Sequence, residues 1–228
     1  MKLLLTSNGL SNQSIAKSFQ ELIGKDPKDT KVAFIPTAAN PERSNKEWLI
    51  NDLYRIKEQG YAVDIIELTA VKPSELQTIL QHFDAIFVGG GNTFYLSYWM
   101  QKVGLFDLLP KLLKTKVYAG ISAGSMVAGR SLVLSSQALS NPEAYQDENY
   151  DVFGPKGESS GKTMSFANLI FRPHLNSRVF SLVREDLLKD KAALTGERVY
   201  ALDDSSALRI VDGEEKVITE GDWRLSEP

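Results

Sequence analysis

The residue types needed for acyl transfer occur in this chain around one short motif. Residues 118–124 read Y-A-G-I-S-A-G, which places Ser122 at the centre of a G-x-S-x-G pattern. In a nucleophile elbow, such a serine stands on a sharp turn between a strand and a helix, and the glycines let the backbone turn. Here K-V-Y-A-G-I before Ser122 predicts the strand, and A-G-S-M-V-A after it predicts the helix. The alternative is a glycine turn that only closes a strand–helix unit.

Two histidines are available as the base that a serine nucleophile requires. His174 follows the strand-like run N-L-I-F-R and Pro173. We therefore expect it at the carboxyl end of a strand, on the same edge of one sheet as Ser122. His82 precedes the strand D-A-I-F-V, which predicts the opposite edge and a structural role at the end of a helix. His174 is the predicted base, and a turn histidine bonded to the backbone is the alternative.

An aspartate pair follows the strand-like run R-V-Y-A-L and offers the carboxylate that orients a catalytic histidine. Either Asp203 or Asp204 fits this role, and a turn-forming role is the alternative because D-D-S-S is favourable turn chemistry. The order serine, histidine, acid differs from that of α/β-hydrolases, in which the acid precedes the histidine. An acid at Asp147 or Asp151 would restore that order, but no clear strand precedes it. The order counts against an ordinary esterase or lipase.

Short apolar runs alternate with segments of helical period along most of the chain. Expected strands are Lys2–Thr6, Lys31–Ile35, Tyr61–Leu68, Asp84–Val88, Lys116–Ile121, Leu169–Arg172 and Arg198–Leu202. Expected helices are Asn12–Ile23, Asn45–Glu58, Pro73–Phe83, Thr93–Val103, Phe106–Leu113, Ala123–Ala128 and Ser177–Leu188. This alternation predicts an α/β fold, a three-layer αβα sandwich around a mostly parallel sheet. Asp212-Gly213 between two apolar runs predicts a C-terminal β-hairpin, and we expect one domain over residues 1–228.

Composition and charge limit the partners and cofactors of the chain. The net charge of −3 and the lack of a basic stripe argue against nucleic acid, because phosphate binding needs clustered lysine and arginine. The chain has no cysteine, which excludes disulfides, thiolate metal sites and cysteine nucleophiles. Only three leucines follow Met1 and Lys2 before Thr6, too few for a secretory signal or a membrane span. We expect a cytoplasmic protein that uses no membrane, metal or cofactor.

Three consecutive glycines, Gly89 to Gly91, close the strand D-A-I-F-V. Such glycines let backbone N–H groups approach a ligand, so this turn is a natural second donor for an oxyanion hole. G-G-G-N-T-F lacks the third glycine of a dinucleotide fingerprint. G-E-S-S-G-K-T at 157–163 has one residue too few for a phosphate-binding P-loop and lies in a long polar segment, residues 137–165. A loop of this length is usually functional or mobile.

Taken in order, G-G-G-N-T-F, G-I-S-A-G, P-H and L-D-D resemble the peptidase E family of serine peptidases. The resemblance covers roughly residues 2–210. This family is related to the cyanophycinases and, more distantly, to the flavodoxin-like fold of class I glutamine amidotransferases. The resemblance implies metal-free cleavage of dipeptides with an N-terminal aspartate by a serine–histidine–acid triad. Its substrate would be a small peptide, and it says nothing of oligomeric state.

The resemblance also implies a role for each matching residue. The site residues are Ser122 as nucleophile, His174 as base, Asp204 as orienting acid, Gly91 and Ala123 as oxyanion donors, and Asn92 and Arg178 as substrate-binding residues. The family usually has glutamate where this chain has Asp204, so the shorter side chain needs a closer backbone, and Asp203 remains a possible substitute. Arg172 and Arg184 are alternatives to Arg178.

One departure from the family bears on specificity. The family's aspartyl dipeptidases carry an acidic residue about fifteen positions after the nucleophile, where this chain has Gln137. Two alternative functions therefore stay open beside the aspartyl dipeptidase. One is a cyanophycinase-like or isoaspartyl-peptide hydrolase that uses the same triad. The other is a small-molecule binder that kept the fold without efficient chemistry. The polar 137–165 segment could form a wall or lid that admits only short peptides.

Overall fold

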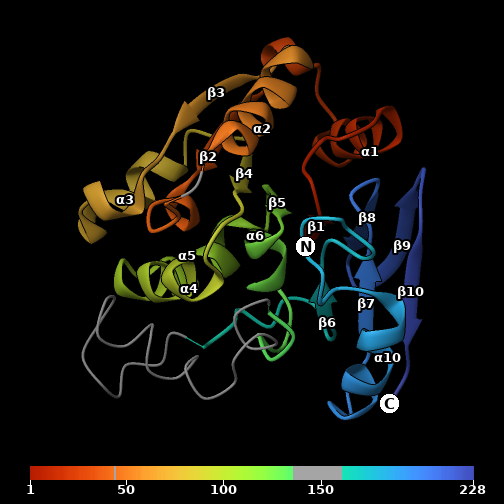
Figure 1. Ribbon diagram of the computed structural model, residues 1–228. Helices are drawn as coiled ribbons and strands as arrows, with labels where there is room; N and C mark the ends of the chain where they lie inside the picture. The colour runs from red at the N-terminus through yellow and green to blue at the C-terminus, as the bar shows by residue number, and fades with distance from the viewer. Residues whose placement is uncertain (44, 136–160) are drawn as a thin grey trace.

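The computed structural model describes residues 1–43, 45–135 and 161–228. Within these residues, the centre of the fold is a seven-stranded sheet in the order β3-β2-β4-β5-β1-β8-β9 (Figure 1). Its strands are β1 (Lys2–Thr6), β2 (Lys31–Ile35), β3 (Ala62–Ile65), β4 (Ala85–Val88), β5 (Val117–Ile121), β8 (Ser206–Val211) and β9 (Glu214–Thr219). The first five run parallel, and the β8–β9 hairpin joins β1 antiparallel. The predicted parallel sheet and C-terminal hairpin are confirmed.

The strands β4 and β5 lie in the middle of this sheet and are buried along their whole length. Their sequences A-I-F-V and V-Y-A-G-I are continuous apolar runs, as expected for parallel strands covered on both faces. β5 pairs with β4 on one side and with β1 on the other, so that Gly120 lies opposite both Val88 and Leu5. The carboxyl ends of these three strands therefore meet at one edge of the sheet.

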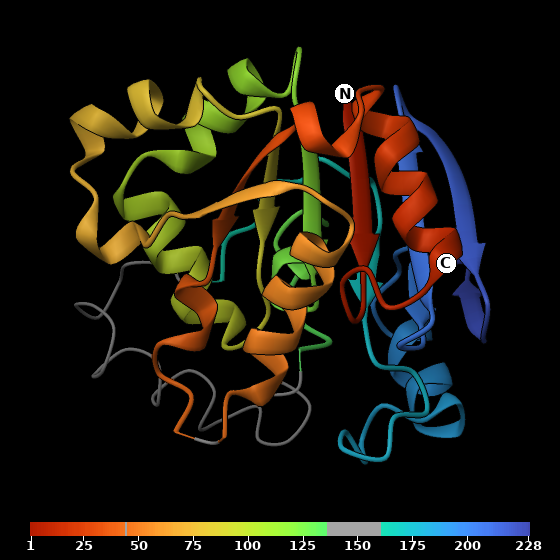
Figure 2. The same cartoon turned by 90° about the horizontal axis from the view of Figure 1, so that it is seen from above.

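Helices cover both faces of the sheet, in the three layers that the sequence predicts (Figures 1 and 2). They are α1 (Gln13–Ile23), α2 (Glu47–Glu58), α3 (Pro73–Leu80), α4 (Thr93–Lys102), α5 (Leu105–Leu112) and the short α6 (Ala123–Met126). Side chains alternate between the faces of each strand. Thus Leu4 packs in the core with α1 and α2, whereas Leu3 and Leu5 pack in the core with α3, α4 and α5. None of the helices in the described ranges is long and apolar enough to span a bilayer.

A second, smaller sheet corrects one expectation. The strands β6 (Ile170–Arg172), β7 (Val199–Leu202) and β10 (Trp223–Ser226) pair with one another in the order β10-β7-β6, separate from the central sheet. The prediction that the runs before His174 and Asp204 belong to the central sheet is wrong. The short, half-exposed β10 was not predicted at all. The carboxyl ends of β6 and β7 nevertheless lie near the carboxyl end of β1. Ser7, which follows β1, donates from Oγ a 2.8 Å hydrogen bond to the Leu202 carbonyl of β7 and accepts a 3.3 Å bond from the N–H of His174, which follows β6.

The predicted helix over Ser177–Leu188 is also wrong. The structure has turns there, and the helix α10 begins later and spans Glu185–Ala193. Asn176 closes the turns, since its N–H donates to the Val183 carbonyl at 2.7 Å and its side chain accepts from the Glu185 N–H at 3.2 Å. Asn176 has φ of 58°, which breaks a helical path, and asparagine adopts that conformation more readily than most residues. Tertiary contacts thus override the apolar spacing in this segment.

Candidate active site

Ser122 stands on a strained turn between β5 and α6. Its φ of 48° and ψ of −106° lie outside the regions that residues with a Cβ usually adopt. The two glycines of the motif make room for this turn. A Cβ on Gly120 would lie 2.5 Å from the Ser125 nitrogen, and a Cβ on Gly124 would lie 2.1 Å from the Val88 carbonyl oxygen. The strand, turn and helix predicted around Ser122 are therefore present. Gly120 is required by the close approach of the α6 backbone, and Gly124 by close packing on β4.

Hydrogen bonds to β1 fix this turn in place. The Ser122 N–H donates to the Thr6 carbonyl at 2.9 Å, and the Thr6 hydroxyl donates to the Gly120 carbonyl at 2.7 Å. Ser125 Oγ accepts from the Thr6 N–H at 2.9 Å and donates to the Thr6 carbonyl at 2.8 Å. Ser125 is fully buried. The serine that follows β5 is thus held at a defined position by a neighbouring strand.

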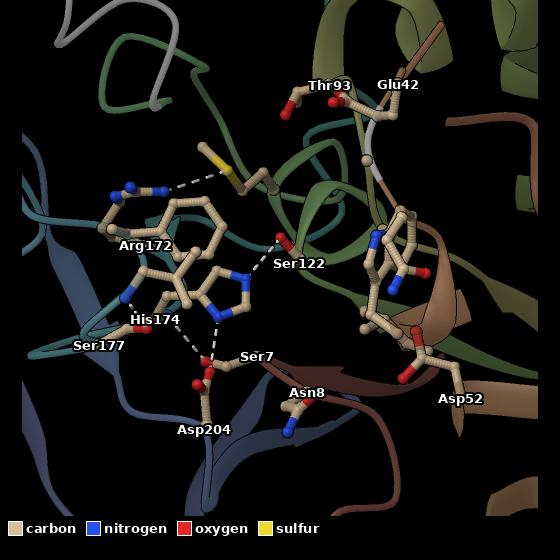
Figure 3. Close-up of a pocket in the computed structure, with 18 residues that line it drawn as sticks. Ser7, Asn8, Glu42, Asp52, Thr93, Ser122, Arg172, His174, Ser177 and Asp204 are labelled. Atoms are coloured by element: carbon tan, nitrogen blue, oxygen red, sulfur yellow. Dashed lines mark hydrogen bonds and ion pairs between the residues drawn. The ribbon is translucent and has the colours of Figure 1, made fainter. Parts of the chain in front are cut away.

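His174 bridges Ser122 and Asp204 in one chain of contacts (Figure 3). Its Nε2 lies 2.9 Å from Ser122 Oγ, and its Nδ1 lies 2.5 Å from Asp204 Oδ1. His174 follows β6 and Asp204 follows β7, so each comes from the end of a strand, as the sequence predicts for residues of a site. In the tautomer with the proton on Nδ1, the imidazole donates a hydrogen bond from Nδ1 to Asp204. Its unprotonated Nε2 can then accept the proton of the Ser122 hydroxyl.

The two adjacent aspartates occupy different positions. The Asp203 carboxylate accepts hydrogen bonds from the Ser205 N–H at 3.0 Å, the Ser206 hydroxyl at 2.6 Å and the Asp222 N–H at 2.7 Å. It therefore holds the turn between β7 and β8. Asp204 faces His174 and lines the same cavity as Ser122. Of the two aspartates that the sequence leaves open, the structure brings Asp204 to the histidine.

Two further residues, neither of them predicted from the sequence, contact His174. Ser7 Oγ accepts a 3.3 Å hydrogen bond from the His174 N–H, which supports a backbone with φ of 66°. The position of Ser7 just after the β1 run, at the same edge as Ser122, was the signal that could have found it. The Phe180 ring stacks on the imidazole, with ring centroids 4.4 Å apart and an interplanar angle of 18°. Phe180 lies in the segment that was predicted as a helix, so no sequence signal pointed to it.

Of the predicted oxyanion donors, Gly91 lines the same cavity as Ser122, and Ala123 follows Ser122 as the first residue of α6. Within the described part of the chain, neither N–H group donates a hydrogen bond. Gly91 has φ of 127°, and a Cβ there would lie 2.2 Å from the Ala38 carbonyl oxygen, so only glycine fits. Gly90, in the same glycine turn that the sequence predicts as an oxyanion donor, lies close to the serine, because a Cβ there would lie 3.3 Å from the Ser122 Cβ.

The structure does not bring the predicted substrate-binding side chains to the cavity. The Asn92 side chain caps α4 and accepts from the Phe94 and Tyr95 N–H groups at 3.1 and 3.0 Å. Arg178 is exposed and lies outside the set of residues that line the cavity. Arg184, the N-cap of α10, is also outside it. Arg172, the remaining alternative, does line the cavity. Burial lowers the pKa of Arg172 to about 9, which leaves it cationic at neutral pH.

Ser122, His174 and Asp204 open onto a cavity of about 580 Å³. Its opposite wall carries two carboxylates, Glu42 and Asp52 (Figure 3). Burial raises the pKa of Asp52 to about 7, against a smaller lowering by Arg55. Burial also raises the pKa of Glu42. Among the described residues, no group of three or more histidine, aspartate or glutamate side chains has the arrangement of a metal site. Gln137 and most of the polar 137–165 segment lie outside the described residues.

A strained serine at the end of a central parallel strand, beside a histidine and an aspartate, defines the arrangement of an α/β serine hydrolase. The sequence model of peptidase family S51 matches residues 3–218. The chain therefore belongs to peptidase family S51 and is a serine-type peptidase.

Individual relatives agree with this assignment. The chain is 26% identical over 180 residues to the uncharacterized peptidase Lmo0363 of Listeria monocytogenes. The aligned region covers 78% of this chain and 81% of the relative. The chain is 31% identical over 134 residues to peptidase E of Shewanella denitrificans, covering 57% of this chain and 54% of the relative. A crystal structure of a candidate peptidase E from Listeria monocytogenes EGD-e shares the fold, with a TM-score of 0.75 at 20% identity over 96% of this chain and 98% of that one.

Proposed function

We propose that this peptidase hydrolyses short peptides, foremost dipeptides with an N-terminal aspartate, through Ser122, His174 and Asp204. The observation that carries the proposal is the unbroken chain of contacts from Ser122 Oγ through the imidazole to Asp204 Oδ1, at 2.9 and 2.5 Å. A hydroxyl, a base and an orienting carboxylate in this order are the parts that acyl transfer to water requires.

The proposed reaction begins when His174 Nε2 takes the proton of Ser122 as its Oγ attacks the peptide carbonyl. Asp204 stabilises the imidazolium that forms, and the Gly91 and Ala123 N–H groups stabilise the oxyanion. The tetrahedral intermediate collapses when His174 gives its proton to the leaving amine, and an acyl-serine remains. Water then attacks the acyl-serine, with His174 again as base, and releases the free acid together with the Ser122 hydroxyl.

The short side chain of Asp204 is compatible with this role because its backbone lies close to the site. Ser11 Oγ donates to the Asp204 carbonyl at 2.7 Å, and Asn12 Nδ2 donates to the Ser205 carbonyl at 2.8 Å. These bonds attach the β7–β8 turn to the segment between β1 and α1. An aspartate therefore reaches His174 in a place where the related peptidases usually use glutamate.

The cavity fits a small and polar substrate. Its volume of about 580 Å³ is in the range of sites for small ligands and suits a peptide of a few residues. Arg172 on one wall offers a positive charge for the side-chain carboxylate of an N-terminal aspartate. Replacing Arg172 with methionine should then raise KM for Asp-X dipeptides more than for Ala-X dipeptides.

The test is release of the leaving amine from a panel of Asp-X, isoaspartyl-X and Ala-X dipeptides. We expect the wild type to cleave Asp-X fastest, and Ser122→Ala to lose at least about a thousandfold in kcat. Ser177→Ala is the matched control, because Ser177 lines the same cavity outside the triad. A serine-directed phosphonate should label Ser122 alone. Faster cleavage of isoaspartyl peptides than of Asp-X dipeptides would assign isoaspartyl peptides as the substrate class. Full activity of Ser122→Ala would overturn the mechanism.

A further inference from the structure

The acidic wall opposite His174 contains a carboxylate that the proposed reaction does not use. Asp52 lies on α2, and only 4% of its side chain is exposed. That small exposed part faces the cavity that contains Ser122. Burying an ionised carboxylate is costly unless it is paired and hydrogen-bonded. The position of Asp52 therefore needs an explanation in terms of what binds to it.

The protein itself compensates Asp52 poorly. Among the described residues, the charged group that pairs with it is Arg55, whose Nη1 lies 3.9 Å from Asp52 Oδ1, beyond hydrogen-bond distance. The same Nη1 donates a 2.9 Å hydrogen bond to the Asn8 carbonyl. Within the described residues, no group donates a hydrogen bond to the Asp52 carboxylate. Burial accordingly raises the pKa of this carboxyl, and the effect of Arg55 only partly opposes it.

Asp52 also lies close to the serine motif. A Cβ on Gly9 would lie 3.3 Å from Asp52 Oδ1 and 3.2 Å from Ile121 Cδ1. The carboxylate is therefore a near neighbour of the side chain that immediately precedes Ser122. In Figure 3, Ser122 lies between Asp52 on one side of the cavity and Arg172 on the other. The cavity thus has Asp52 on one wall and Arg172 on the opposite wall, where His174 and Asp204 also lie, with the nucleophile between the two walls.

We propose that Asp52 binds the α-ammonium group of the peptide substrate and thereby restricts cleavage to the first peptide bond. This inference rests on the proposed function, in which Ser122 attacks that bond. The α-ammonium is two bonds from the carbonyl carbon of the same residue, so an anchor near Ser122 can hold both. A primary ammonium supplies the charge and the hydrogen-bond donors that Asp52 lacks. Glu42, half-buried on the same wall, adds negative charge there.

The test measures binding, so that it does not depend on turnover. Ser122→Ala is titrated with Asp-Leu and with N-acetyl-Asp-Leu in a calorimeter, alone and combined with Asp52→Asn. We expect Asp-Leu to bind about ten- to a hundredfold more tightly than its acetylated form, as one charge-assisted hydrogen bond implies. Asp52→Asn should remove that preference by weakening Asp-Leu and leaving the acetylated dipeptide unchanged. Glu58→Gln is the matched control, since Glu58 is an exposed acid on the same helix.

Each other outcome overturns the inference. Equal affinity for both dipeptides, an unchanged preference in Asp52→Asn, or no binding of either dipeptide would each do so. Binding of N-acetyl-Lys-Leu as tight as that of Asp-Leu would show that Asp52 reads a basic side chain instead. The proposed function fails separately, through absence of turnover and of Ser122 labelling in the wild type. If the enzyme cleaves N-acetylated and free peptides equally well, the proposed triad stands and the proposed role of Asp52 is wrong.

Discussion

Asp203 and Asp204 are neighbours in the sequence with different surroundings. Three donors from the protein satisfy the Asp203 carboxylate, while the Asp204 carboxylate contacts the imidazole of His174. Asp204→Asn should lower kcat by about ten-thousandfold, because an asparagine favours the wrong histidine tautomer. Asp203→Asn should instead lower stability by about 1–3 kcal/mol and leave kcat within a few-fold, since it weakens the turn. Steady-state kinetics and urea unfolding of both variants separate the two effects. Equal losses of kcat would mean that both aspartates orient the histidine.

Asp52 should make stability depend on pH. In the unfolded chain an aspartate has a pKa near 4, whereas burial raises the pKa of Asp52 to about 7 in the folded protein. Below about pH 4 the Asp52 carboxyl is protonated in both the folded and the unfolded state, so its ionisation does not lower the free energy of unfolding. Between pH 4 and 7 the unfolded chain ionises first, so the free energy of unfolding falls as pH rises, and the full cost remains above pH 7.

Asp52→Asn removes this ionisation and should therefore stabilise the protein more at pH 8 than at pH 5. The raised pKa corresponds to up to about 4 kcal/mol at pH 8. Urea unfolding of wild type and variant between pH 5 and 8 measures the difference, with Glu58→Gln as the exposed control. A difference that does not grow with pH would contradict the prediction. A side chain that lowers the stability of the empty enzyme in this way is consistent with a role in binding a cation.

At the scale of the elements, the turn over residues 175–183 positions the histidine. Phe180 in this turn covers one face of the His174 ring, and Asn176 closes the turn against Val183 and Glu185. Phe180→Ala should lower kcat about tenfold because the imidazole gains freedom, and KM should rise less than kcat falls, since Phe180 is one of many residues that line the cavity. Phe180→Tyr should restore kcat, since it retains the stacked ring. A rise of KM alone in Phe180→Ala would assign Phe180 to substrate binding.

The sequence predicts the elements of the central sheet well for a physical reason. Strands such as β4 and β5 are buried on both faces, so their apolar runs are unbroken, and glycines mark where they end. The pattern around Ser122 is also local, because the turn itself requires the glycines. The aspartate pair could not be resolved from sequence, since adjacent residues after one strand differ only in the tertiary contacts they reach.

Other features were not predictable because distant residues determine them. β6 and β7 have the same apolar character as the strands of the central sheet, and nothing local shows that they pair in a separate sheet with β10. The turn over residues 175–183 has apolar residues at helical spacing, yet Phe180 packs on a histidine instead of forming a helix face. Asn92 and Arg178 were carried over by resemblance, and their side chains lie elsewhere because a helix cap and an exposed turn position them.

At the scale of the molecule, the site depends on both sheets together. Ser122 follows a strand of the central sheet, whereas His174 and Asp204 follow strands of the smaller one. The two sheets share one apolar core, in which Phe171 and Leu202 of the smaller sheet pack in one cluster with Leu5 of β1 and with α4 and α6. Because neither sheet buries this surface alone, we expect the chain to unfold as one cooperative unit.

The prediction is that activity, tryptophan fluorescence and far-ultraviolet circular dichroism are lost at the same urea concentration. Two of the three tryptophans, Trp48 and Trp99, lie on helices of the central sheet, and Trp223 lies on β10, so fluorescence reports on both sheets. Trp223→Phe is the informative control, because the fluorescence transition of this variant comes from Trp48 and Trp99 and reports on the central sheet and its helices alone. Loss of activity before the other signals, with a second transition visible only when Trp223 is present, would mean that the smaller sheet unfolds separately. In that case the chain would contain two units, and docking of one on the other would set the distance between Ser122 and His174.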